Sequence, residues 1–151
     1  MPFVLEVRPY ADADVQALVD QVQQEYVVRY GGPDQAQVDP TDFDPPAGLF
    51  LVGLLDGAPV AMGGWRRMDA TRAEIKRMYV AVPARRRGLA RRVLTELESR
   101  AREAGITELV LNTGREQPEA IELYESSGYT PVPGFGHYAC APRALFYGKQ
   151  L

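Results

Sequence analysis

Residues 73–94 read AEIKRMYVAVPARRRGLARRVL, and this stretch divides into three parts. Apolar and β-branched residues predict a strand over about residues 72–82, which Pro83 ends. Three arginines, Arg85–Arg87, form a short loop, and a helix is then predicted over residues 88–104. Its apolar positions fall on one face and are Leu89, Ala90, Val93, Leu94, Leu97 and Ala101.

A loop of this kind, between a strand and a helix, suits the binding of phosphate groups. The first amides of a helix have no partner within it and carry a partial positive charge. Glycine at position 88 lets a ligand approach the backbone closely, and the arginines add charge. The pattern is not a P-loop, because no Gly-Lys-Ser/Thr follows, and it lacks the triple glycine of a dinucleotide site. Two other interpretations are open: a solvated helix face and a nucleic-acid contact, the latter disfavoured by the net charge of −3.

The chain before this stretch predicts one strand, one helix, a loop and a hairpin. Residues 2–9 form a short strand, and Asp12 or Asp14 caps a helix that ends near Tyr30. Residues 33–48 hold four prolines and four aspartates, which predicts a loop. Asp56-Gly57 suits the tight turn of a hairpin, and the strand over residues 72–82 extends that hairpin into an antiparallel meander.

The chain after this stretch predicts a strand, a helix and two irregular strands. The strand covers residues 106–113, and the helix begins at Pro118 and ends before Gly128. The irregular strands cover residues 129–138 and 143–151. The fold class is therefore α/β, of the mixed α+β kind, with a mostly antiparallel sheet of about six to seven strands and helices on both faces.

The composition predicts one domain over residues 1–151 in the cytoplasm. Hydrophobic residues are 46% and charged residues 25%, as in ordinary globular proteins. No apolar run approaches the roughly 20 residues of a membrane span, and the first residues lack the pattern of a signal peptide. The single cysteine, Cys140, cannot build a disulfide or a zinc site alone, so we expect no metal.

Charge is unevenly distributed along the sequence. Residues 66–102 hold 12 basic and four acidic residues, whereas residues 10–60 hold one basic and nine acidic residues. We therefore expect one part of the surface to favour an anion and another part to favour a cation.

The hexapeptide Arg85-Arg86-Arg87-Gly88-Leu89-Ala90 resembles the acyl-CoA signature of the GNAT superfamily of N-acetyltransferases, Arg/Gln-x-x-Gly-x-Gly/Ala. The strand before it, the helix after it and the later LNTG…EAIELYESSGYTPV are also similar to that superfamily, and the resemblance covers residues 3–151. It implies acetyl-CoA as co-substrate, with the pyrophosphate on backbone amides of the loop and the pantetheine arm paired with the strand before it. It also implies that the sheet splays after this strand. The cofactor-binding residues implied are Met78, Tyr79, Val80, Arg85, Arg86, Arg87, Gly88, Leu89, Ala90, Arg91 and Asn112, with the oxyanion site near Tyr79 or Val80.

The resemblance also implies two catalytic residues. Tyr124 is the candidate acid that protonates the leaving thiolate, and its alternative is a core aromatic on an amphipathic helix. Glu74 is the candidate base, and its alternative is a strand carboxylate paired with Lys76 or Arg72. Catalytic roles for His137 and Cys140 are disfavoured. Strict alternation predicts two strand faces, one with Glu74, Lys76, Met78 and Val80 and one with Ile75, Arg77 and Tyr79.

The implied reaction is direct transfer of acetyl to a primary amine. We expect the acceptor to be a small molecule, while a protein N-terminus or lysine, a homodimer, and a non-catalytic CoA-binding module stay open. Aromatic residues are available for the acceptor site, namely Tyr26, Tyr30, Phe43, Trp65, Phe135 and Tyr138. The loop aspartates Asp34, Asp39, Asp42 and Asp44 either make that site acidic, which suits a cationic amine, or only solubilise the loop.

Overall fold

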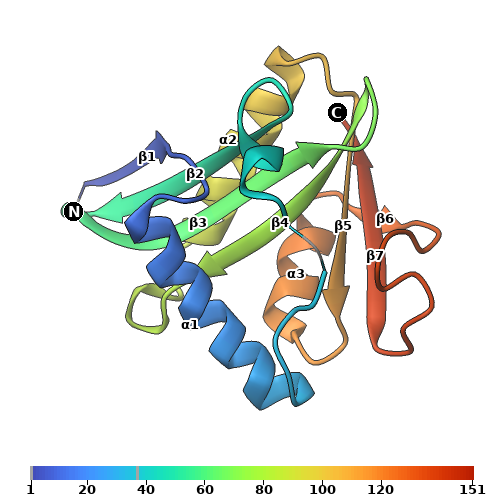
Figure 1. The fold of residues 1–151 in the computed structure, drawn as a ribbon, viewed down its shortest axis with the longest axis horizontal. Coiled ribbons are helices and arrows are strands. Elements are labelled where there is room, and N and C mark those ends of the chain that lie inside the picture. The colour runs from blue at the N-terminus through green and yellow to red at the C-terminus, as the bar shows by residue number, and fades with distance from the viewer. Residues whose placement is uncertain (1, 37) are drawn as a thin grey trace.

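The computed structural model describes residues 2–36 and 38–151, and a seven-stranded sheet forms its centre (Figure 1). The strand order is β1-β2-β3-β4-β5-β7-β6. All neighbours are antiparallel except β4 and β5, which are parallel. The strands are β1 (Phe3–Val7), β2 (Gly48–Leu55), β3 (Ala58–Arg67), β4 (Arg72–Val80), β5 (Glu108–Gly114), β6 (Thr130–Pro131) and β7 (Ala144–Gln150).

Helices cover both faces of the sheet, which confirms the predicted fold class. Helix α1 (Ala13–Tyr30) packs on one face, and α2 (Leu89–Glu103) and α3 (Pro118–Ser126) pack on the other (Figure 1). The Asp12 side chain accepts from the amides of Asp14 and Val15, so Asp12 is the cap of α1. Within the described ranges, no helix is long and apolar enough to cross a membrane.

Turn-forming residues explain one prediction that is confirmed, the hairpin, and one that is wrong, the long strand after α3. Asp56 and Gly57 both have positive φ, 51° and 84°, as a primed hairpin turn requires, and they join β2 to β3. The strand predicted over residues 129–138 is wrong in extent, because only Thr130–Pro131 pairs with β7. Prolines and glycines fill the following segment, where they remove amide donors and favour turns.

Strand β4 contains one extra residue, which changes the faces of its side chains. Gly64 pairs with Lys76 and Met62 pairs with Tyr79, so Arg77 and Met78 both lie opposite the single residue Gly63. Arg77 has φ of 60°, as expected at such a bulge. A Cβ atom on Gly63 would lie 2.4 Å from the Met78 sulfur, so the close approach depends on glycine.

The predicted alternation is therefore wrong beyond Lys76. The core on the α2 side contains Ile75 and packs against Met78 and Val80, whereas the core on the α1 side contains Tyr79. The consequence is that β4 presents its charged side chains to the α1 side and the apolar Met78 and Val80 to the α2 side. The sequence pattern could not show this, because the bulge depends on pairing with β3.

Strands β4 and β5 diverge after a short paired section. Pairing covers only Arg72–Glu74 with Glu108–Val110, and beyond it the two strands separate into a V (Figure 1). The edge of β4 from Ile75 onward consequently has no strand beside it on the β5 side. The splay that the resemblance implied is thus present in the sheet.

Candidate active site

The V between β4 and β5 holds a cleft of about 1010 Å³. Its walls include residues 75–80 of β4 and 111–114 of β5. The helices α1, α2 and α3 line it as well, together with the loops after α1 and before α2 and the segment that leads into β7. Most of the residues implied for the cofactor lie along this cleft, and one of them, Arg87, does not. Those along the cleft are Met78, Tyr79, Val80, Arg85, Arg86, Gly88, Leu89, Ala90, Arg91 and Asn112.

The start of α2 lies at the cleft with an open approach to its backbone. Gly88 precedes the first residue of α2 and has φ of 74°, and Arg86 also has positive φ, 65°. No heavy atom lies within 4 Å of the Cβ that Gly88 lacks, so the space beside it is open. The unpaired amides of the first helical turn are accordingly accessible to an anion.

The Arg85 side chain is fixed by contacts with other residues of the chain. Its Nε donates to the Val80 carbonyl at 2.8 Å, and its Nη2 lies 2.6 Å from Glu25 Oε2 of α1. The guanidinium also lies over the Tyr79 ring, 5.5 Å from the centroid. Arg85 therefore fixes the end of β4 against α1, and its charge is already matched by a carboxylate.

The backbone amide of Val80 is directed toward the cleft. The next amide, that of Ala81, donates to the Val60 carbonyl at 2.7 Å and so points toward β3. Successive amides along a strand point to opposite edges, which turns the Val80 N–H toward the open edge of β4. A donor at this position can stabilise negative charge that develops on a carbonyl oxygen within the cleft.

Tyr124 of α3 is buried in the cleft wall, with 5% of its surface exposed. Its ring packs edge-on against Tyr129, with centroids 5.7 Å apart. Burial raises the pKa of the Tyr124 phenol well above its ordinary value, and Tyr26 adds to the shift. The hydroxyl is therefore protonated over the whole neutral range.

Glu74 lines a second, smaller cavity of about 220 Å³ and not the large cleft. The two cavities share Lys76, Asn112 and Tyr138 as lining residues. Arg66 of β3 contacts Glu74 Oε1 through Nη2 at 3.2 Å, and the Lys76 ammonium lies 4.0 Å from Oε2. Of the partners suggested for this carboxylate, Lys76 is present, whereas Arg72 pairs with Asp69 and Glu108.

A cluster of buried charges lies at the residues that both cavities share. The Asp34 carboxylate forms ion pairs with Lys76, at 3.6 Å, and with Arg77. It also accepts from the Tyr138 hydroxyl and from the amide of Ala36. Burial works against the charge on Asp34, but Lys76, the Ala36 amide and Arg77 outweigh it and hold the pKa of this carboxyl below its usual value.

The loop aspartates do not form an acidic acceptor site. Asp34 is matched by the two basic residues of β4, and Asp42 forms an ion pair with Arg66 at 3.1 Å. Asp39 caps a short 3-10 helix, Pro40–Phe43. Among the described residues that line the smaller cavity, Glu74 is the one carboxylate, beside two cations.

The predicted aromatic residues divide between the cavities and the core. Tyr26, Tyr30 and Tyr138 line the cleft, and Phe135 lines the smaller cavity together with His137. The expectation was wrong for two others: Phe43 stacks on Tyr10 in the core, and the Trp65 indole donates to the Leu97 carbonyl at 3.1 Å. Cys140 is exposed and lines neither cavity.

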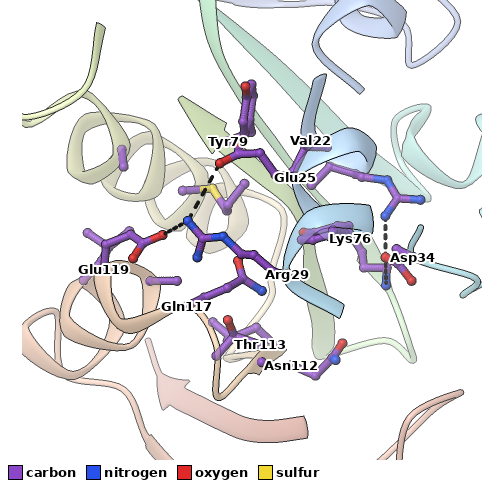
Figure 2. A pocket seen from close by; sticks show the side chains of 18 of the residues that line it. Val22, Glu25, Arg29, Asp34, Lys76, Tyr79, Asn112, Thr113, Gln117 and Glu119 are labelled. Carbon is purple, nitrogen blue, oxygen red and sulfur yellow. Dashed lines mark hydrogen bonds and ion pairs between the residues drawn. The ribbon is translucent and has the colours of Figure 1, made fainter. Parts of the chain in front are cut away.

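One residue of the cleft, Arg29, was not anticipated from the sequence. Its side chain reaches from α1 to α3, where Nη2 lies 2.7 Å from Glu119 Oε1 (Figure 2). Its Nη1 also donates to the carbonyl of Glu116, just before α3, at 2.9 Å. Glu25 lies 3.8 Å from the same guanidinium. The residues joined are far apart in the chain, so no local pattern indicates this bridge.

The chain is similar in sequence to known acetyltransferases. Residues 16–129 match the family model described as "Acetyltransferase (GNAT) family". A protein of Azospirillum brasilense named "IAA acetyltransferase" is 33% identical over 154 residues, which cover 100% of each chain.

Two solved structures have a fold similar to that of this chain. A Klebsiella pneumoniae protein assigned to the acyl-CoA N-acyltransferases has a TM-score of 0.83 at 27% identity, over 99% of this chain and 97% of that chain. The PaiA N-acetyltransferase of Thermoplasma acidophilum, solved with coenzyme A, has a TM-score of 0.73 at 14% identity, over 98% and 99%. At that identity the second likeness shows the common fold alone.

Proposed function

The chain belongs to the GNAT acetyltransferase family and is an acyltransferase, and we propose that it transfers acetyl from acetyl-CoA directly to a primary amine. The observation that carries this proposal is the cleft between β4 and β5, which runs from the open start of α2 to the buried hydroxyl of Tyr124. The cleft volume and its unpaired backbone edge fit a long, flexible cofactor arm. Acetyl-CoA would supply an activated acyl carbon as its thioester.

The residues at the mouth of the cleft would hold the cofactor by backbone and charge. We assign the pyrophosphate to the amides of residues 86–91, because they surround the start of α2, where Gly88 leaves open space. The arginines of the loop add a positive field, although Arg85 itself is engaged with Glu25. The open edge of β4 from Met78 to Val80 would pair with the amide groups of the pantetheine arm, and Asn112 would contact it from β5.

Three groups would act on the reacting atoms. The Val80 amide, directed into the cleft, would stabilise the oxyanion. The hydroxyl of Tyr124, protonated at neutral pH, would give its proton to the departing sulfur. Glu74 would take a proton from the acceptor in the smaller cavity, through water or directly, because it lies on the cavity that adjoins the cleft at Lys76 and Asn112.

The test is thiol release from acetyl-CoA with a panel of amines, followed by variants assayed on the best acceptor. We expect Tyr124→Phe to lower kcat by about 10²–10⁴-fold, the usual contribution of general acid–base catalysis. The matched control is Tyr129→Phe, since Tyr129 is the neighbouring buried tyrosine and bonds Glu98 rather than facing the cleft. Glu74→Gln should lose most activity at neutral pH and recover part of it as alkaline pH deprotonates the amine.

Two results would change the proposal in different ways. Near-normal turnover in both Tyr124→Phe and Glu74→Gln would remove the assigned roles and leave acetyl transfer intact. Tight CoA binding without thiol release for any amine would instead favour the second candidate, a non-catalytic CoA-binding module. That candidate is the weaker one, because Tyr124 and Glu74, the two candidate catalytic residues, line cavities that share three lining residues.

A further inference from the structure

The smaller cavity beside the cleft has a wall of unusual charge. Its lining includes the cations Arg66 and Lys76 and the carboxylate Glu74, with His137 at an exposed position. The carboxylates that balance these cations elsewhere, Asp34 and Asp42, do not line this cavity. The lining itself carries two cations and one carboxylate, and a molecule bound there can approach a cation and a carboxylate together.

Lys76 is the most unusual member of this wall. Its side chain is only 6% exposed, yet it lines both cavities. An ammonium has three donors, and a hydrogen bond from nitrogen to oxygen needs about 2.7–3.2 Å. Its two ion-pair contacts, 3.6 Å to Asp34 and 4.0 Å to Glu74, are both longer than that. Within the described ranges, Lys76 therefore retains donor capacity that a ligand in either cavity can use.

From this wall we infer that the acceptor is a small α-amino carboxylate, an inference that rests on the proposed acetyl transfer. Its carboxylate would bind Lys76, and its ammonium would face Glu74. In an α-amino acid the two charged groups are two bonds apart, and Lys76 and Glu74 offer the complementary charges 4.0 Å apart. Two opposite charges on the ligand therefore match two opposite charges on neighbouring positions of one strand face.

The remainder of the cavity sets the size and the character of the acceptor. About 220 Å³ is below the roughly 300–1,000 Å³ of sites for drug-sized ligands. Phe135, Tyr138 and Ala36 form its apolar part, which suits a short apolar or aromatic side chain. An internal lysine of a protein lacks the carboxylate that the cationic wall would bind, so this site favours the free amino acid.

The position of the cavity supports transfer to such an acceptor. Lys76, Asn112 and Tyr138 line both cavities, so the two spaces adjoin at these residues. In the step itself, the amine nitrogen bonds to the thioester carbon and the carbon–sulfur bond breaks. The ammonium loses two protons. The first leaves through Glu74 to solvent, and the second makes up for the proton that Tyr124 gives to the sulfur. The products are an N-acetyl amino acid, CoA thiol and one proton.

The experiment compares amino acids with their own decarboxylated amines in the thiol-release assay. Phenylalanine against 2-phenylethylamine and alanine against ethylamine are suitable pairs, and phenylalanine amide separates charge from size. We expect the amino acid to have a kcat/KM at least about 100-fold higher, since loss of a buried charge pair costs about that factor or more. This comparison uses the unaltered protein and needs no variant.

A lysine variant then locates the recognition. Lys76→Met should raise KM for the amino acid by about 100-fold more than it raises KM for the decarboxylated amine, so the preference disappears. The matched control is Lys149→Met, which removes an ion-paired lysine from β7, where it pairs with Glu98 away from both cavities. Equal use of amines and amino acids by the unaltered protein, or equal losses for both in Lys76→Met, would overturn the inference while the acetyltransferase function stands.

Two further outcomes separate this inference from the proposed function. Thiol release with simple amines but with none of the amino acids would reject the α-amino carboxylate and keep acetyl transfer. Failure of the protein both to bind CoA and to release thiol with any acceptor would reject the proposed function itself.

Discussion

Two groups of basic residues beside the cleft differ in how their positive charge is balanced. The β4 cluster, Lys76 and Arg77, is buried, with side chains 6% and 5% exposed, and both cations pair with Asp34. The loop cluster, Arg86 and Arg87, is exposed to solvent before α2. A buried cation needs a carboxylate from its own chain even when no ligand is bound, whereas an exposed cation is solvated until a ligand supplies an anion. The first cluster therefore shapes the site and the second is suited to capture a phosphate.

The largest expected effect comes from removing the shared carboxylate of the β4 cluster. Asp34→Asn leaves Lys76 and Arg77 buried without their common counter-charge, which should lower the free energy of unfolding by about 3–5 kcal/mol. Urea denaturation measures this change. The control is Asp44→Asn in the same loop, because Asp44 is exposed. A loss from Asp34→Asn no larger than that of the control would show that the cluster does not depend on its internal pairing.

The next effect tests the loop cluster and its backbone. Gly88→Asp places a negative charge at the start of α2, where we assign the pyrophosphate, and should weaken CoA binding by about 100-fold. Calorimetric titration with CoA measures it. Gly88→Asn is the matched control, since it imposes a side chain at the same positive φ without the charge. Equal affinities of the two variants would assign the effect to backbone strain instead of charge.

A smaller effect is expected from acid. The pKa of Asp34 is lowered in the folded protein, so its contribution to stability is complete above the ordinary aspartate value of about 3.9. That contribution is lost as the pH falls through the folded-state value, because protonation removes the charge that pairs with Lys76. The difference in unfolding free energy between the unaltered protein and Asp34→Asn should therefore shrink as the pH is lowered from 6 to 2. A difference that stays constant to pH 2 would contradict this linkage.

The smallest effect is expected from a single exposed arginine. Arg87→Ala should weaken CoA binding only a few-fold, and the difference should shrink as salt is raised, because exposed charges are screened. Its urea midpoint should match that of the unaltered protein. A loss as large as that of Gly88→Asp would mean that the side chains, and not the amides, hold the pyrophosphate.

Local chemistry predicted much of the fold. The cap at Asp12 and the turn at Asp56-Gly57 depend on neighbours in sequence, so their residue types were sufficient. The apolar positions of α2 were predicted in the same way, since Leu89, Val93 and Leu97 are buried as their spacing requires. These are features that one segment determines by itself.

The parts of the site that were missed depend on distant pairing. The bulge in β4 exists because Arg77 and Met78 share one partner, Gly63, on another strand. Two ion pairs were missed for the same reason: Arg29 with Glu119, and Asp34 with the β4 cluster. In each pair the residues are distant in sequence and come into contact only in the tertiary structure. Charge counts along the chain therefore predicted an acidic side where the structure has matched pairs.

The bulge in β4 gives this strand a tolerance of length that substitutions would not reveal. Arg77 is the extra residue, so its deletion would let Met78 pair with Gly63 while the pairs Gly64–Lys76 and Met62–Tyr79 stay in register. Met78 would remain on the α2 side, and the Tyr79 ring would remain beside Gln21 on the α1 side. The deletion would remove one cation that pairs with Asp34, so the extra residue adds a charge to the α1 side of the strand without shifting the residues that follow it.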